Sequence, residues 1–234
     1  MTGLGFNARR RALLTVITAI ALVSGAAATV LAFDDVPDGA YFEDAVAWTD
    51  DQDIANGRPD GLFDPYADVT RGELVTMVWR LAGEPPADPP SYTDVPAGAF
   101  FETAVGWAED VGLTTGIGGG EFAPYASTKR SEVVTFLWRY VCRPAEAAAH
   151  GFTDVVAGSF YELAVKWAKA EMITTGTTDT TFDPNGTTDR AQAATFVWRL
   201  AGMPAVGDPG INRTTGLPTC NTAPVLDAIG DQSV

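Results

Sequence analysis

The sequence predicts a mostly α-helical protein built from three helix–loop–helix repeats, and three observations lead to this fold class. A polar turn followed by an apolar stretch occurs three times, centred on Arg71, Arg130 and Arg190. These arginines are 59 and then 60 residues apart, and a tryptophan follows each of them eight residues later. Apolar residues on both sides of each turn recur at helical spacing. Self-similarity at a fixed period indicates a tandem array in which each repeat is one supersecondary unit.

The repeats cover residues 33–83, 92–142 and 152–202, and they align without internal gaps. A unit of about 50 residues buries too little surface to be stable alone. We therefore expect the three repeats to share one core and to unfold as one unit. The linkers between them are short, and the first is rich in proline.

An apolar face predicts the first helix of each repeat. In repeat 1, Tyr41, Ala45 and Trp48 form one stripe, and Phe42 and Val46 form the next, so a broad buried face is expected. The helix is expected to end near a glycine, because glycine accepts the positive φ that closes a helix. The equivalent aromatic and glycine positions are Tyr41, Phe100 and Phe160; Trp48, Trp107 and Trp167; and Gly57, Gly116 and Gly176.

The loop after the first helix is rich in turn residues. In repeat 1 it contains Asp60-Gly61, a turn signal, followed by Phe63 and Pro65. We expect the phenylalanine to enter the core as an apolar plug that holds the loop in place.

The second helix is predicted to begin at the arginine turn. Thr70 and Glu73 have the spacing of a capping box, in which each side chain accepts a backbone N–H group of the other residue. Asp189 and Gln192 can form the same pair in repeat 3. Repeat 2 has Lys129 at the cap position, and because its ammonium group cannot accept a hydrogen bond, a weaker helix start is expected there.

The chain has two cysteines, Cys142 and Cys220. Cys142 takes the place of Gly83 and Gly202, which are expected to end the second helices of the other repeats. Two cysteines are too few for a disulfide framework, although an oxidising location permits them to pair. Their pairing stays open, and no metal-ligand spacing includes either of them.

The two ends of the chain differ from the repeats in composition. Residues 1–32 resemble a signal peptide, with three arginines at 9–11 before an uncharged apolar run and a cleavage site before Phe33. That run is about 20 residues long, so it would reach across a membrane only if left uncleaved. Residues 203–220 are predicted to be a linker. Residues 221–234 look like the first strand of a cadherin-like or immunoglobulin-like domain.

The formal net charge of −15 argues against nucleic acid as a partner, because proteins that bind it carry basic patches that neutralise phosphates. There are only three lysines, so arginine has to meet any anion that the protein binds. The single histidine, His150, lies in a linker, and no nucleophile motif accompanies it. We therefore expect neither an enzyme nor a cofactor.

Taken together, Phe-x-Asp-Val, the mid-helix tryptophan, the glycine, Asp-Gly-x-Phe-x-Pro and Thr-Arg-x-Glu resemble the S-layer homology family over residues 33–202. The resemblance implies a pseudo-three-fold symmetric assembly of helices with grooves between the repeats. It also implies a secreted protein, anchored non-covalently at the bacterial cell surface to an anionic secondary cell-wall polysaccharide that often bears pyruvate ketals. S-layer or other surface proteins are then expected as neighbours.

The resemblance also implies site residues. The ligand's carboxylate is expected to bind Arg71, Arg130 and Arg190. The groove lining is expected to include the three tryptophans and three glycines of the first helices and loops, together with Asp35, Asp94 and Asp154. Only repeat 1 has Thr-Arg-x-Glu intact. Repeat 2 reads Lys-Arg-Ser-Glu and repeat 3 reads Asp-Arg-Ala-Gln. The grooves should therefore differ, and Arg71 is the first candidate.

Two interpretations of the arginines remain open. Free backbone N–H groups at a helix N-terminus, together with a guanidinium, form a site for a carboxylate. On this interpretation, Arg71→Ala or Arg190→Ala weakens wall binding without unfolding the protein. The alternative is an ion pair between repeats with an acid such as Asp35. The other expected site residues also have a second interpretation, in which the tryptophans are core residues and the aspartates cap a turn.

A calcium-dependent interaction module of the dockerin type is the alternative function. Asp50, Asp51 and Asp53 look like calcium ligands, but they do not follow the Asp-x-Asp-x-Asp-Gly spacing of a calcium loop. No metal site is therefore expected.

Overall fold

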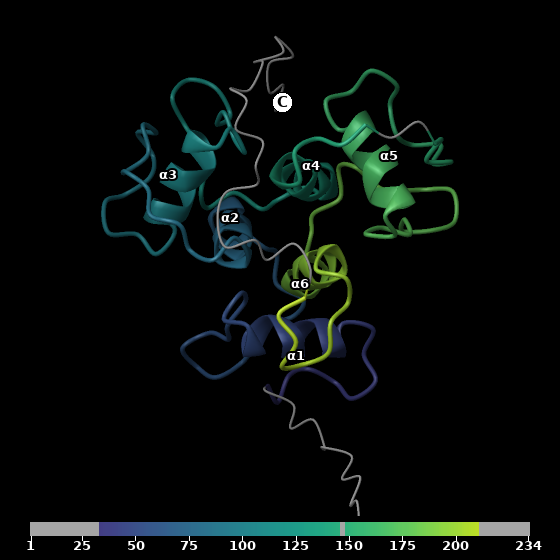
Figure 1. Ribbon diagram of the computed structural model, residues 1–234, viewed down its shortest axis with the longest axis horizontal. Helices are drawn as coiled ribbons and strands as arrows, with labels where there is room; N and C mark the ends of the chain where they lie inside the picture. Colours follow the sequence, from purple (N-terminus) through teal and green to yellow (C-terminus); the bar gives the residue numbers. More distant parts are fainter. Residues whose placement is uncertain (1–32, 146–147, 211–234) are drawn as a thin grey trace, which may run out of the picture. The chain divides into compact units, whose positions relative to one another are not determined.

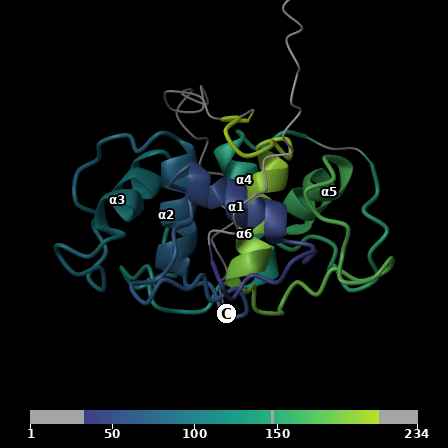
Figure 2. The ribbon, with the colours of Figure 1, turned by 90° about the horizontal axis from the view of Figure 1, so that it is seen from below.

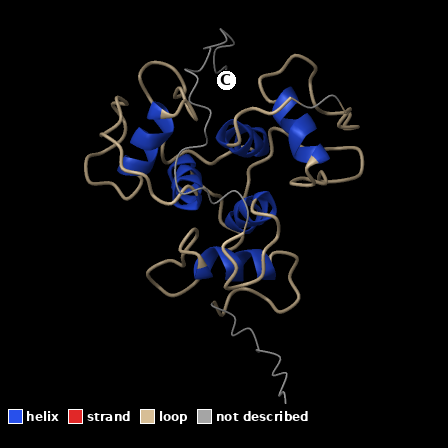
Figure 3. Cartoon of the chain, in the orientation of Figure 1, coloured by secondary structure: helices blue, strands red, loops and turns tan. Residues whose placement is uncertain are grey.

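The computed structural model describes residues 33–145 and 148–210 (Figure 1). The signal peptide expected at 1–32, the strand expected at 221–234 and residues 211–220 of the expected linker lie outside this part of the chain. Within it there are six α-helices and no β-strand (Figure 3), which confirms the mostly helical fold class. None of the described helices is long and apolar enough to cross a membrane.

Each repeat contributes a helix of nine residues and then one of eleven. The shorter helices are α1 (Glu43–Asp51), α3 (Glu102–Asp110) and α5 (Glu162–Ala170). The longer helices are α2 (Arg71–Leu81), α4 (Arg130–Tyr140) and α6 (Arg190–Leu200). The second helices thus begin at the predicted arginines.

The six helices form a pseudo-three-fold arrangement, as the resemblance implied. Helices α2, α4 and α6 contact one another at the centre, and α1, α3 and α5 lie outside them (Figures 1 and 2). The helix pairs do not follow the repeats, however, because α3 packs on α2, α5 on α4 and α1 on α6. Each lobe therefore joins the second helix of one repeat to the first helix of another, and the α1–α6 pair closes the ring.

A cycle of main-chain hydrogen bonds joins the three repeats just before the second helices. The Val69 N–H group donates to Thr188, that of Thr188 donates to Thr128, and that of Thr128 donates to Val69, each over 2.9 Å. All three side chains are fully buried. We call these three residues the backbone cycle. No repeat can complete it alone.

The buried face of the first helices was predicted correctly except at its outermost position. Phe42, Ala45, Val46 and Trp48 are buried, but Tyr41 is 64% exposed. Helix α1 starts only at Glu43, so Tyr41 precedes it, and its ring lies edge-on to Phe42 at 5.1 Å. The equivalent Phe100 is 65% exposed for the same reason.

The prediction that the first helices end near Gly57, Gly116 and Gly176 is wrong. Helix α1 ends at Asp51, and Asp53, with a φ of 56°, already supplies the left-handed residue. The later glycines serve close packing instead. A Cβ atom on Gly57 would lie 2.3 Å from an edge atom of the Phe33 ring, so a larger residue there would displace that ring.

The second helices end as predicted. Gly83 and Gly202 have φ values of 83° and 91°, and Cys142 takes the same left-handed conformation at 70°. Cys142 is disulfide-bonded, while Cys220 lies outside the described residues.

The described part of the expected linker is packed rather than free. Residues 203–210, which we call the strap, fold back over α1. The Trp48 indole donates a hydrogen bond to the Asp208 carbonyl at 2.7 Å, and the Gly207 N–H group donates to the Asp51 carboxylate at 2.9 Å. This part of the expected linker is therefore held against α1.

Candidate ligand-binding grooves

Asp35, Asp94 and Asp154 hold the loop that precedes each second helix. The two carboxylate oxygens of Asp35 accept the backbone N–H groups of Phe63 and Asp64, at 2.9 and 2.6 Å. Asp94 and Asp154 make the equivalent pairs of bonds. The contacts seat Phe63 in the core, where it is fully buried, which confirms the predicted plug.

The Asp154 carboxyl group shows the electrostatic effect of these bonds. Burial pushes its pKa up, but the hydrogen bonds from the Phe182 and Asp183 backbone outweigh burial and hold the pKa below its ordinary value. The three aspartates thus act as clamps on the loop, with both carboxylate oxygens already engaged.

The three arginines are buried, with exposed fractions of 4% for Arg71, 7% for Arg130 and 5% for Arg190. Each reaches from one repeat into another. Arg71 donates from Nε to the Phe122 carbonyl at 2.9 Å and from Nη1 to the Glu132 carboxylate at 2.5 Å. Its guanidinium carbon lies 4.9 Å from the centre of the Phe122 ring, a cation–π arrangement.

Arg190 closes the ring with the same contacts. Its Nε donates to the Phe63 carbonyl at 2.8 Å and its Nη1 to the Glu73 carboxylate at 3.0 Å. Burial lowers the Arg190 pKa, and the neighbouring Glu73 opposes this shift. An ion pair between repeats is therefore present, with a glutamate and not with Asp35. Because removing one partner of a buried ion pair costs about 3–5 kcal/mol, we now expect Arg190→Ala to destabilise the fold.

The helix N-termini do not offer free N–H groups. The Arg71 N–H group donates to the Ala126 carbonyl at 3.0 Å, and that of Gly72 to the Pro124 carbonyl at 2.8 Å. The first two residues of α4 and α6 bind loop carbonyls of another repeat in the same way. The prediction of an anion site at these N–H groups is therefore wrong, because carbonyl groups of another repeat already accept their hydrogen bonds.

The three helix caps differ, as the sequence indicated. Thr70 and Glu73 form the complete capping box. In repeat 2, Glu132 accepts the Lys129 N–H group at 2.8 Å, so one half of the box is kept. Repeat 3 keeps the other half, because the Asp189 carboxylate accepts the Gln192 N–H group at 2.7 Å.

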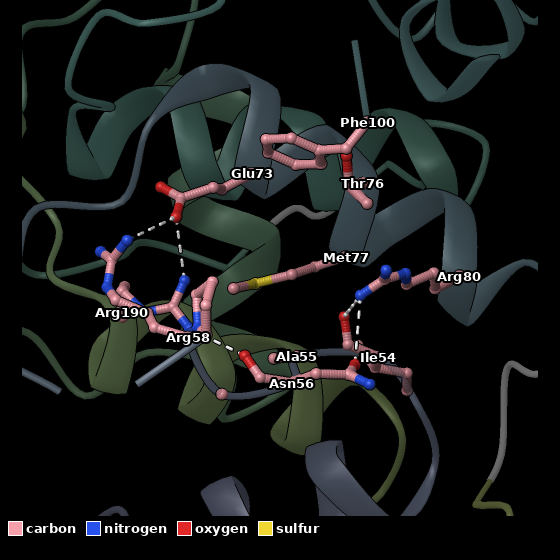
Figure 4. Close-up of a pocket in the computed structure, with 12 residues that line it drawn as sticks. Ile54, Ala55, Asn56, Arg58, Glu73, Thr76, Met77, Arg80, Phe100 and Arg190 are labelled. Carbon is pink, nitrogen blue, oxygen red and sulfur yellow. Dashed lines mark hydrogen bonds and ion pairs between the residues drawn. The ribbon is translucent and has the colours of Figure 1, made fainter. Parts of the chain in front are cut away.

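A cavity of about 320 Å³ lies between residues 54–59, α2 and Arg190 (Figure 4). We call it groove 1. Arg58, Arg80 and Arg190 line it, and Glu73 is the only acid among its lining residues. Phe100 of repeat 2 borders it with an exposed ring. An anionic group would meet several guanidinium groups here.

The cations of groove 1 are held by short-range contacts. Arg58 lies 2.9 Å from the Asp64 carboxylate and 3.8 Å from that of Glu73. Arg80 donates to the Asn56 side chain at 3.2 Å, and Arg190 donates from Nη2 to the Asn56 carbonyl at 3.1 Å. Arg58 and Arg80 are partly exposed, whereas Arg190 is buried and each of its three guanidinium nitrogens donates one hydrogen bond.

The structure brings only some of the expected site residues to groove 1. Gly57 and Arg190 line it. Arg71 lies in the equivalent position one repeat further on. The first-helix tryptophans are core residues with exposed fractions of at most 4%, and they present no open face to a sugar: Trp48, Trp107 and Trp167.

Sequence reasoning missed Arg58, Arg80 and Phe100. A signal existed for Arg80, because an arginine directly follows each second-helix tryptophan in all three repeats. Arg58 has no such signal, since the equivalent residues are Ile117 and Thr177. No group of three or more acidic, histidine or cysteine residues in the described ranges could hold a metal ion.

Comparison with known proteins identifies relatives of this chain. The family model for the S-layer homology domain matches residues 32–75, 91–134 and 151–194. A cell surface protein of Thermoanaerobacter kivui is 30% identical over 137 residues, which cover 54% of this chain and 18% of that protein. The S-layer protein EA1 of Bacillus anthracis is 24% identical over 188 residues, which cover 75% of this chain and 21% of that protein.

A third relative is a cellulosome-anchoring protein of Acetivibrio thermocellus, 30% identical over 136 residues. That alignment covers 53% of this chain and 29% of the relative. The chain therefore spans less than a third of the length of each of these relatives.

Proposed function

The chain belongs to the S-layer homology domain family, and from that premise we propose that it is a non-covalent cell-wall anchor. Its ligand is an acidic cell-wall polysaccharide, which it binds in the grooves between repeats. Family and relatives support a location outside the cytoplasm, at the bacterial cell surface. The proposed role is binding and not catalysis.

One observation carries this proposal: the concentration of guanidinium groups around groove 1. The protein as a whole has a net charge of −15, yet three arginines and one glutamate line this cavity. Guanidinium groups suit the carboxylate of an acidic sugar or of a pyruvate ketal, since they donate two parallel hydrogen bonds. The exposed Phe100 ring at the rim adds an aromatic surface of the kind that lines ligand sites.

The predicted residues take different roles in this mode of binding. Arg71, Arg130 and Arg190 build the back of each groove and hold the repeats together. The more exposed Arg58 and Arg80 supply the reachable charge in groove 1. Asp35, Asp94 and Asp154 keep the loops in place, and surface proteins such as an S-layer are the proposed neighbours of the anchored molecule.

Co-sedimentation with purified bacterial cell walls tests the proposal. Arg58→Gln removes a reachable cation from groove 1, and we expect roughly tenfold weaker retention, equivalent to about 1.4 kcal/mol. Arg143→Gln makes the same charge change outside the groove and should bind normally. Raising the salt concentration should weaken binding of the unaltered protein, because salt screens exposed charges.

Two results would contradict this function. Equal retention of Arg58→Gln and Arg143→Gln would show that groove 1 does not bind the wall. Release of the protein by EDTA would instead favour the calcium-dependent alternative of the dockerin type.

A further inference from the structure

The chain contains two Asn-Gly pairs, and the structure gives their backbones opposite environments. The first is Asn56-Gly57, whose two residues line groove 1, and the second is Asn185-Gly186, in the turn before α6. Both asparagines are exposed. In such a pair the glycine nitrogen can attack the side-chain amide of the asparagine, because glycine has no side chain that shields its backbone.

The Gly57 N–H group has no hydrogen-bond acceptor among the described residues. The equivalent N–H groups of the other repeats, those of Gly116 and Gly176, each donate to a threonine hydroxyl two residues earlier, at 3.1 Å. Repeat 1 has Ala55 at that position, and its methyl group accepts no hydrogen bond. The Gly57 nitrogen is therefore available as a nucleophile.

Two arginines stabilise the negative charges that this attack creates. The attacking form is the deprotonated Gly57 amide, whose charge is shared with the Asn56 carbonyl oxygen, and Nη2 of Arg190 donates to that oxygen at 3.1 Å. Nη1 of Arg80 donates to the Asn56 side-chain oxygen at 3.2 Å, where negative charge develops as the nitrogen attacks Cγ. A hydrogen bond to a charged form favours that form, and a donor at a developing oxyanion lowers the barrier.

The Asn185-Gly186 pair is protected from the same reaction. The Gly186 N–H group donates to the Asp183 carbonyl at 3.2 Å, and the Gly186 carbonyl accepts the Arg130 N–H group at 2.9 Å. The Asp183 carboxylate packs against Gly186 so closely that a Cβ atom there would lie 2.3 Å from one of its oxygens. A neighbouring negative charge disfavours deprotonation of the Gly186 amide.

We propose that Asn56 is a modification site at which groove 1 gains a carboxylate by spontaneous deamidation. The Gly57 nitrogen bonds to Cγ of Asn56 and loses its proton. The bond from Cγ to Nδ2 breaks, and the NH₂ group takes up a proton and leaves as ammonia. Water then opens the cyclic imide at either carbonyl and gives aspartate or isoaspartate. The step needs no oxidant or enzyme, and water reaches it because both residues line the cavity.

The modification changes the charge and the contacts of groove 1. Either product places a negative charge beside Arg80, where the neutral amide was, and so reduces the positive charge offered to an acidic ligand. The hydrogen bond of 3.2 Å from the Asn56 amide to the Asp53 carboxylate is lost, and two like charges then meet. Isoaspartate also adds a carbon atom to the main chain and displaces the carbonyl that Arg190 holds. The chemical step is independent of the proposed function, whereas its effect on wall binding rests on that function.

Incubation of the full chain at mildly alkaline pH, followed by peptide mass spectrometry, measures both Asn-Gly pairs in one sample. We expect Asn56 to convert several-fold faster than Asn185. Hydroxylamine, which cleaves a cyclic imide, should cut the chain after residue 56. In denaturant the two pairs should react at similar rates, because the difference arises from the fold. Equal rates in the folded protein, or the same difference in denaturant, would overturn the proposal.

A matched exchange at residue 55 tests the role of the unbonded N–H group. Ala55→Thr supplies the hydroxyl that the other repeats use and should slow deamidation of Asn56 several-fold. Ala55→Val has nearly the same shape without an acceptor and should react like the unaltered protein. Ala55 is buried, so Ala55→Ser offers the hydroxyl in a smaller side chain and should slow the reaction too. Equal rates in all these variants would overturn the proposal.

Co-sedimentation with cell walls separates the modification from the proposed function. Asn56→Asp carries the charge of the product and should be retained less than the unaltered protein. Asn56→Gln forms a cyclic imide far more slowly, so its retention should stay constant during an incubation that weakens the unaltered protein. Conversion of Asn56 with undiminished retention would overturn the effect on groove 1. If the unaltered protein never bound walls, the proposed function would fall, while the mass spectra would still decide the modification site.

Discussion

Val69, Thr128 and Thr188 occupy equivalent positions in the backbone cycle, but only the threonines bury a hydroxyl group there. Neither hydroxyl has a hydrogen-bond partner in the described part of the chain. A buried polar group without a partner is destabilising, and replacing it by an apolar group of the same shape removes that cost. Repeat 1 already carries the apolar form.

We therefore expect Thr128→Val to raise the free energy of unfolding by about 1 kcal/mol. Denaturant unfolding followed by circular dichroism measures this change. Val69→Thr is the matched reverse exchange and should destabilise the protein. A loss of stability in Thr128→Val would show that the hydroxyl is satisfied, for example by a buried water molecule.

The Asp154 clamp predicts a pH dependence. Its folded-state pKa is lowered by hydrogen bonds that outweigh burial, so the unfolded chain binds this proton more tightly than the folded protein does. The clamp therefore stabilises the fold above the unfolded-state pKa, and this stabilisation is lost as the pH falls through the folded-state pKa. Carboxyl NMR titration should place Asp154 below the ordinary aspartate range.

Asp154→Asn is the control for that titration. It should reduce the acid sensitivity of the unfolding free energy, since asparagine does not titrate. An Asp154 pKa at or above the ordinary value would contradict the clamp.

Sequence reasoning found the recurring arginines and aspartates but not their partners. Arg71 meets Glu132 at a separation of 61 residues, and Arg190 meets Glu73 at a separation of 117. Recurrence marks a residue as part of the repeat, but it does not say which repeat supplies the partner. The prediction of free N–H groups at the helix starts is wrong for the same reason, because carbonyl groups of another repeat accept their hydrogen bonds.

At the scale of single elements, the starts of the second helices were predicted well and the ends of the first helices were not. Capping is local, so the Thr70–Glu73 pair is visible in the sequence and present in the structure. The glycine after each first helix is also visible, but its role depends on an aromatic ring from the start of the repeat. The sequence shows that Gly57 recurs in each repeat, but it does not show that the Phe33 ring packs closely against it.

The incomplete cap of α4 predicts a stabilising substitution. Lys129→Thr should restore the capping box of repeat 2 and raise the free energy of unfolding by about 1 kcal/mol. Thermal unfolding at low salt measures the change. Thr70→Lys makes the opposite exchange in repeat 1 and should destabilise by a similar amount. Equal stability of both variants and the unaltered protein would show that these caps do not contribute to the free energy of unfolding.

For the whole molecule, the sequence predicted the number of repeats and their shared core but not how the repeats interlock. Periodicity defines a unit of one first and one second helix, whereas packing pairs α1 with α6 and α3 with α2. Nothing local distinguishes the two pairings, because the apolar faces of the repeats are equivalent. In the closed ring of three lobes, the apolar face of every first helix packs against the second helix of another repeat.

This interlocking predicts that no repeat can be removed separately. Deleting residues 152–210 takes away α5 and α6, so that α1 and α4 lose their packing partners and the backbone cycle opens. We expect the remaining chain to lose its cooperative thermal transition. Adding a peptide of residues 152–210 should recover helical circular dichroism. A cooperative transition in the shortened chain alone would show that the repeats are independent.

The strap has a mechanical consequence. Through Trp48 and Asp51, residues 203–210 are tied to the first helix, and that helix rests on α6 of the last repeat. Tension entering the chain at residue 210 therefore pulls first on the lobe where the last and first repeats meet. Resistance to such pulling is set by how fast that lobe opens, because forced unfolding is governed by the unfolding rate. Groove 1 lies beside that lobe, between residues 54–59 and Arg190, so opening the lobe by tension would also separate the two sides of the groove.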